Sequence, residues 1–196
     1  MGVIESREEI KVLDLQGGYC RVETDGEKEL PSFVKAVTSG CGGIFSLINV
    51  LPDRGNSGIS DFSLRGEEIA GLMKSFQRKS ETYRKTGGTH SAALSDGGKI
   101  LIFAEDIGRH NAFDRVIGMA LAGGIPFEDK VLLTSGRISS EIVAKCIRAG
   151  LPVIISRSAP TDYAVKVAEN FGIAVVGFAR GERYNIYSRA ERILLP

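Results

Sequence analysis

After residue 100, short apolar runs alternate with amphipathic stretches. Continuous apolar runs at 100–103, 131–133, 153–155 and 173–178 are typical of buried strands. Between them, apolar residues three and four positions apart predict helices that pack on a core; Phe113, Ile117 and Leu121 mark the first, and 139–149 and 161–171 follow. This alternation indicates an α/β fold. We expect 184–187, with Ile193, to close the sheet.

The first thirty residues carry a different pattern. Two short alternating runs, 10–15 and 19–24, flank Gln16-Gly17-Gly18 and predict a β-hairpin. A lone hairpin buries little, so we expect residues 1–30 to be the remnant of an N-terminal β subdomain and 31–196 to form the α/β domain. Cys20, in the second run, is expected to be a small core or sheet residue.

Two helices are predicted between these regions. Residues 63–79 place five apolar side chains on one face, with acidic residues early and basic residues late, which suits the helix dipole. The small residues of 89–94 suggest a tightly packed helix capped by Thr89 or Gly88. His90 would then lie in its first turn.

Polar residues crowd the junction between the run at 100–103 and the next helix. Six of the seven positions from 105 to 111 are polar or glycine, and they include one of only two histidines in the chain. They are Glu105, Asp106, Gly108, Arg109, His110 and Asn111. Asp106 alone could be a helix cap, and Glu105 with Arg109 a surface ion pair. The density of polar groups favours a ligand site, because strand ends and helix N-termini commonly bind ligands and anions.

Arginines follow four of the predicted strands. Their planar, charged forks suit phosphate groups, so we expect an anionic, phosphate-bearing ligand across the strand ends. The alternative is that they are solvated turn residues. The arginines in question are Arg109, Arg137, Arg157, Arg180 and Arg183.

Cys41 has glycine at three of its four nearest positions. Such glycines permit unusual backbone conformations and leave the sulfur accessible, which favours a reactive thiol. A free cysteine is otherwise most often a small buried hydrophobe, and this is our interpretation of Cys146. Three cysteines at these spacings do not form a disulfide framework.

Composition narrows the classes of function. The chain has 196 residues and a net charge of +1, so no overall field favours nucleic acid or a membrane surface. The N-terminus has no signal-peptide pattern and no apolar run is long enough to span a bilayer, so we expect a cytoplasmic protein. The sequence contains no P-loop, no G-x-G-x-x-G and no zinc-ligand spacing, so no zinc is expected.

Five segments together resemble the FdhD family of formate dehydrogenase accessory sulfurtransferases. They are SGCGG at 39–43, TGGTHSAAL at 86–94, EDIGRHNAFDRVIG at 105–118, TSGRISSEIV at 134–143 and VGFARGERYNIYS at 176–188. The resemblance is collinear and covers essentially the whole chain, although a family N-terminal portion is expected to be missing. It implies an α/β fold with a cytidine-deaminase-like three-layer core, a mixed sheet and a small N-terminal β-hairpin appendage, without the deaminase zinc.

The resemblance also implies a function. Family members accept sulfur from a cysteine desulfurase and pass it to the molybdenum bis-guanine-dinucleotide cofactor, Mo-bisMGD, before its insertion into formate dehydrogenase. Cys41 matches the persulfide-carrying cysteine. Many members carry Cys-x-x-Cys here, whereas this chain has Ile44 at the second position. A binding-only cofactor chaperone therefore stays open; a nucleotide hydrolase is disfavoured, because no phosphate-and-metal motif is present.

The resemblance assigns the cofactor-binding loop to residues near the C-terminus, and the strand exits add further candidates. We expect a homodimer, with Cys41 on the same side of the sheet as Arg109, His90 and Arg137, and 53–61 as a lid. His90 and His110 are expected to orient the ligand or move protons. The loop residues are Phe178, Ala179, Arg180, Gly181, Glu182 and Arg183, and the further candidates are Gly88, His90, Arg109, His110, Ser135 and Arg137.

Overall fold

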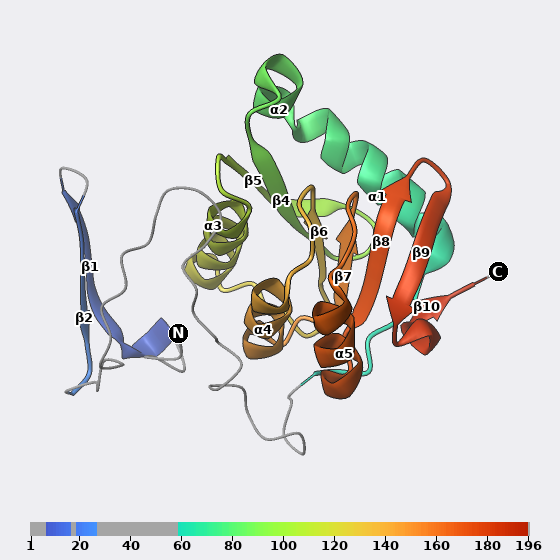
Figure 1. Ribbon diagram of the computed structural model, residues 1–196. Coiled ribbons are helices and arrows are strands. Elements are labelled where there is room, and N and C mark those ends of the chain that lie inside the picture. Colours follow the sequence, from blue (N-terminus) through green and yellow to red (C-terminus); the bar gives the residue numbers. More distant parts are fainter. Residues whose placement is uncertain (1–6, 17–18, 27–58, 196) are drawn as a thin grey trace. The chain divides into compact units, whose positions relative to one another are not determined.

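The computed structural model describes residues 7–16, 19–26 and 59–195 (Figure 1). The chain divides into two compact units, Met1–Val37 and Thr38–Pro196. The predicted domain boundary after residue 30 lies outside the described residues and stays a prediction.

The first unit contains the predicted hairpin. A short 3-10 helix, η1 (Arg7–Glu9), leads into β1 (Ile10–Gln16), which pairs antiparallel with β2 (Tyr19–Thr24). Cys20 lies opposite Leu15 and is exposed, so it is a sheet residue and not a core residue.

The second unit is organised around a six-stranded mixed sheet of order β5-β4-β6-β7-β8-β9 (Figure 1). β4 is antiparallel to both β5 and β6, β6 to β8 are parallel, and β9 is antiparallel to β8. The carboxyl ends of β5, β6, β7 and β8 therefore share one edge, where β4 and β9 begin. The strands are β4 (His90–Ser95), β5 (Ile100–Asp106), β6 (Val131–Thr134), β7 (Val153–Ser156), β8 (Ala174–Arg180) and β9 (Arg183–Ser188).

Helices cover both faces of this sheet. On one face, α3 (Arg109–Ala122), α4 (Ser140–Ala149) and α5 (Asp162–Phe171) share an apolar cluster with alternate strand residues. On the other face, α1 (Gly66–Lys79) packs its buried side chains against the remaining strand residues. The result is a three-layer α/β unit with a mixed sheet, as expected. Its likeness to cytidine deaminases stays a prediction.

The prediction of a helix over 89–94 is wrong. These residues belong to β4, and the helix lies earlier, at α2 (Glu81–Thr86), which ends at Gly87 with φ of 67°. β4 pairs with a strand on each side, and Ser91 to Ser95 are all buried. Small side chains suit a strand covered on both faces as well as they suit a tightly packed helix. The hydrogen bonding of these residues to β5 and β6 therefore determines that they form a strand. Gly88 and Thr89 therefore cap no helix, and His90 begins a strand.

Two boundaries also differ from the predictions. β10 (Ile193–Leu194) pairs in parallel with β3 (Leu64–Arg65), so Ile193 does not close the main sheet. It packs instead in the apolar cluster around α1. Leu64 and Arg65 lie in a strand, so α1 begins only at Gly66. In α3 the buried side chains include Phe113, whereas Leu121 is exposed.

Across 7–16, 19–26 and 59–195, no helix is long and apolar enough to cross a membrane.

Candidate functional site

Polar residues from several strands meet at the edge where β5 to β8 end. We call this edge the carboxyl edge. It carries His90 at the start of β4, Ser135 and Gly136 after β6, and Arg157 after β7. A backbone hydrogen bond connects the ends of β6 and β7. In it, the Arg157 N–H donates to the Thr134 carbonyl oxygen at 3.3 Å. The sheet topology thus brings residues that are far apart in the sequence to the same edge.

Ser135 is fixed against β4 by three contacts. Its Oγ accepts from the Ser91 backbone N–H at 2.9 Å and lies 3.3 Å from His90 Nδ1. Its own backbone N–H donates to the Ser91 carbonyl oxygen at 3.0 Å. The structure therefore brings together two of the predicted site residues, His90 and Ser135.

Arg109 joins the same cluster from the N-terminus of α3. A Cβ atom placed on Gly136 would lie 3.0 Å from Arg109 Cβ and 3.4 Å from His90 Nδ1. Burial lowers the pKa of His90, and the charge of Arg109 lowers it further. The imidazole is thus neutral at pH 7. Arg109 forms no ion pair with any described residue, and its Nε is buried without a hydrogen-bond partner there.

His110 sits in a different setting, between α3 and α4. Burial lowers its pKa most, followed by the charges of Lys145 and Arg109, while Glu141 and Asp114 act in the opposite direction. Lys145 Nζ lies 2.6 Å from both carboxylate oxygens of Asp114. His110 therefore belongs with the charged contacts between these two helices.

The two carboxylates at the end of β5 have structural partners. Glu105 accepts hydrogen bonds from the backbone N–H groups of Thr82 at 3.0 Å and Tyr83 at 2.9 Å, and so caps α2. Asp106 accepts from the Gly108 N–H and the Asn111 side-chain amide. Glu105 therefore pairs with α2 rather than with Arg109. Asp106 makes a local turn contact and does not cap α3, whose N-cap residue is Gly108.

The segment from Phe178 to Arg183 comprises the end of β8, the two-residue turn Gly181-Glu182 and the first residue of β9. Phe178 has a φ of 52°, which L side chains rarely adopt, and its ring is 41% exposed. Its N–H donates to the Ser158 carbonyl oxygen at 3.1 Å. Ala179 is buried in the apolar cluster around α1, and the residue has almost no exposed surface to offer a ligand. Gly181 has a φ of 59°, and Glu182 is exposed.

Arg180 and Arg183 are paired across this turn, and both are exposed. The Nε of Arg180 donates to the Arg157 carbonyl oxygen at 3.2 Å, which ties the turn to the exit of β7. With Arg109 and the exposed Arg137, the carboxyl edge presents several guanidinium groups. Such an edge attracts phosphate.

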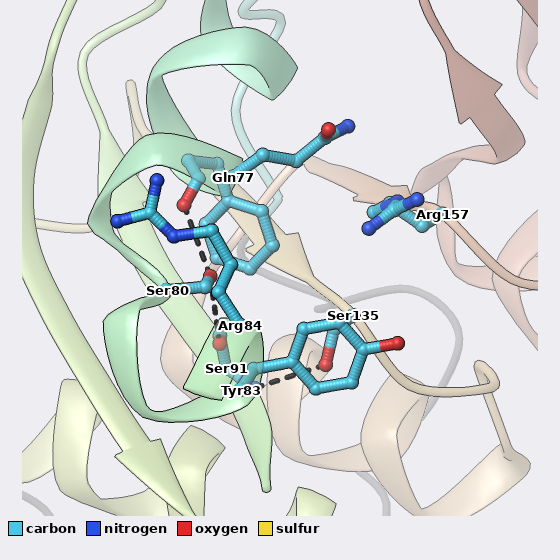
Figure 2. A pocket seen from close by; sticks show the side chains of 8 residues that line it. Gln77, Ser80, Tyr83, Arg84, Ser91, Ser135 and Arg157 are labelled. Atoms are coloured by element: carbon cyan, nitrogen blue, oxygen red, sulfur yellow. Dashed lines mark hydrogen bonds between the residues drawn. The ribbon is translucent and has the colours of Figure 1, made fainter. Parts of the chain in front are cut away.

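A pocket lies at the carboxyl edge, between α1, α2 and the strand ends (Figure 2). It encloses about 380 Å³, including space open to solvent. Tyr83 and Arg84 come from α2, and sequence reasoning missed both, because nothing in TYRK distinguishes a ligand-facing pair from surface residues. We call it the α2 pocket. It is lined by Phe76, Gln77, Ser80, Tyr83, Arg84, Ser91, Ser135 and Arg157.

The remaining predicted residues are placed as follows. Gly88 lies in an exposed loop, where its N–H donates to Thr86 Oγ1 at 3.1 Å. Cys146 is buried in α4 as predicted, and burial raises the pKa of its thiol. Cys41 and residues 53–58 lie outside the described residues. In the part of the chain that the structure describes, no group of three or more His, Cys, Asp or Glu side chains could hold a metal ion.

Residues 1–194 match the model of the FdhD/NarQ family. The chain belongs to this family. It is 40% identical to a sulfur carrier protein FdhD from Bacillus pumilus (strain SAFR-032), over 98% of this chain and 76% of that protein. It is 47% identical to a sulfur carrier protein FdhD from Listeria monocytogenes serovar 1/2a, over 76% of this chain and 54% of that protein. The chain thus spans about half to three quarters of these relatives.

A solved structure supports the same assignment. It is a crystal structure from Desulfotalea psychrophila, described as a formate dehydrogenase accessory protein, and it is 29% identical with a TM-score of 0.78. The match covers 98% of this chain and 74% of that chain. The α/β fold described above is therefore a fold of this family.

Proposed function

We propose that this protein is a sulfur carrier required for formate dehydrogenase activity. It takes sulfur from a cysteine desulfurase and passes it to Mo-bisMGD before the cofactor enters formate dehydrogenase. The observation that carries the proposal is the row of guanidinium groups at the carboxyl edge, set beside a neutral histidine and a fixed serine. The names of the relatives, sulfur carrier and formate dehydrogenase accessory protein, support the same role.

The carboxyl edge supplies what a large nucleotide cofactor needs. Arg180 and Arg183 at the β8–β9 turn, with Arg137 and Arg109, hold its phosphates through charge-assisted hydrogen bonds. The positive φ at Gly181 lets the backbone approach the guanine or ribose closely. His90, neutral and next to Ser135, orients the ligand or accepts a proton from it.

Cys41 is the proposed sulfur acceptor. Its thiolate attacks the outer sulfur of the donor's persulfide; the new S–S bond forms on Cys41 and the desulfurase leaves as a thiolate. The Cys41 persulfide then presents this sulfur to the metal of the docked cofactor. Its delivery as a sulfide ligand takes two electrons, which we assign to a thiol reductant, and returns Cys41 to the thiolate. We place this chemistry in the cytoplasm, in a homodimer.

Binding without sulfur transfer is the second candidate. Ile44 stands where many family members have a second cysteine, so no neighbouring thiol at that spacing can shuttle the persulfide. Cys146 cannot replace it, because its buried thiol has a raised pKa and stays protonated. In this alternative, the arginine row holds and delivers Mo-bisMGD, and Cys41 has no role.

Complementation separates the two candidates. The chain is expressed in a bacterium that lacks its own FdhD protein, and formate dehydrogenase activity is measured. We expect the wild-type chain to restore activity, Cys41→Ala to restore none, and Cys146→Ala to match the wild type. Full activity with Cys41→Ala would leave the binding-only chaperone, and no activity with any variant would reject both candidates.

A further inference from the structure

The α2 pocket has the chemistry of a nucleotide subsite that the β8–β9 turn does not supply. Among its eight lining residues there are two arginines and no carboxylate. Neither Arg84 nor Arg157 forms an ion pair with any described residue, and the Nε of Arg157 is buried there without a hydrogen-bond partner. Uncompensated positive charge of this kind favours an anionic ligand.

The rest of the lining favours a planar ring. Tyr83 is 41% exposed, and an exposed aromatic ring is a surface on which a base can stack. Phe76 is fully buried and closes the pocket on the α1 side. Gln77 contributes an amide that can donate and accept hydrogen bonds. Figure 2 shows Arg84 and Arg157 at opposite sides of the pocket in this view, with Gln77 above and the Tyr83 ring below, beside Ser135.

The pocket walls differ in how firmly they are held. Ser80, Ser91 and Ser135 are joined by hydrogen bonds, Ser91 Oγ to Ser80 Oγ at 2.9 Å and Ser91 N–H to Ser135 Oγ at 2.9 Å, which makes a fixed floor. α2 has no buried residue and is tied to β5 through Glu105. Tyr83 and Arg84 therefore stand on an element that can adjust around a ligand.

Arg157 connects the α2 pocket with the β8–β9 turn. Arg157 lines the pocket, and its carbonyl oxygen accepts the hydrogen bond from Arg180 Nε in the β8–β9 turn. A ligand whose phosphates lie on Arg180 and Arg183 can thus extend along Arg157 into the pocket.

We propose that the α2 pocket holds the base end of a purine nucleotide, with the ring stacked on Tyr83 and its nearest phosphate between Arg84 and Arg157. The inference rests on the proposed function only for the choice of guanine as the base. It assigns Tyr83, Arg84, Gln77 and Arg157 to ligand binding, in addition to the β8–β9 turn.

Calorimetry with GDP and the full chain tests this assignment. We expect Arg84→Gln to weaken binding roughly tenfold or more, because a charge-assisted contact is lost. Tyr83→Leu should weaken it by roughly fivefold or more through lost stacking, while Tyr83→Phe keeps the affinity. Arg78→Gln is the matched control, since Arg78 is an exposed arginine of α1 that does not line the pocket.

Photolabelling with 8-azido-GDP adds a map of where the base lies. The inference predicts label on the tryptic peptide 80–84, which contains Tyr83. Unchanged affinity in Arg84→Gln and Tyr83→Leu, with weaker binding in Arg183→Gln and label only at 178–183, would overturn the α2 pocket and leave the proposed function intact. Absence of GDP binding by the wild-type chain would overturn both.

Discussion

Gly136 lies so close to Arg109 that a Cβ atom at position 136 would sit 3.0 Å from the Cβ of that arginine. The same atom would lie 3.4 Å from His90 Nδ1. The three residues come from the exit of β6, the start of α3 and the start of β4. The missing side chain at position 136 is therefore what lets these elements converge at the carboxyl edge.

A methyl group at this point should cost stability. We expect Gly136→Ala to lower the free energy of unfolding by about 1–3 kcal/mol, because Arg109 Cβ cannot move without shifting α3. Gly118→Ala is the matched control: a Cβ there meets nothing within 4 Å, and the residue lies inside α3. It should raise the free energy by about 0.5–1 kcal/mol. Urea unfolding of both variants measures this, and equal effects would contradict the crowding.

The attachment of α2 should depend on pH. Burial alone would raise the pKa of Glu105, but the N–H groups of Tyr83 and Thr82 outweigh it, so the pKa lies below the ordinary 4.5. A lowered carboxyl pKa contributes stability that is complete above 4.5 and is lost as the pH falls through the folded-state value. Hydrogen-exchange protection of the Thr82 and Tyr83 amides should follow this course. In Glu105→Ala protection should be low at every pH, and wild-type protection in that variant would contradict the cap.

His90 should titrate below its ordinary pKa of 6.5. Burial is the larger cause and Arg109 the smaller, so Arg109→Gln should raise the pKa of His90 without restoring it fully. Lys145→Gln is the control, because Lys145 lowers the pKa of His110 instead. NMR titration of the two ring signals distinguishes these effects. An unchanged pKa of His90 in Arg109→Gln would contradict the effect of the Arg109 charge on His90.

The sequence predicted the strands and helices after residue 100 because their apolar patterns are strong. Val131 to Thr134, for example, is buried throughout, and Thr161 caps α5 through a hydrogen bond from the Ala164 N–H. The stretch 89–94 was mispredicted because its small residues carry no periodic signal. Only pairing with β5 and β6 makes it a strand.

The sequence predicted which charged residues lie at the candidate site, but it did not predict their hydrogen-bond partners. Each strand exit with an arginine could be recognised, because the exits follow directly from the strand pattern. The role of Glu105 could not be recognised, because its carboxylate accepts hydrogen bonds from N–H groups more than twenty positions earlier in the chain. Tyr83 and Arg84 face the pocket only because α2 packs at the ends of β4 and β5.

Mass spectrometry of the protein after incubation with a cysteine desulfurase and cysteine tests the central claim most directly. Sulfur carriage predicts an added mass of about 32 Da that thiol reductants remove. The added mass should be absent in Cys41→Ala and present in Cys20→Ala and Cys146→Ala. Persistence of the added mass in Cys41→Ala, mapped by digestion to Cys20 or Cys146, would contradict the account.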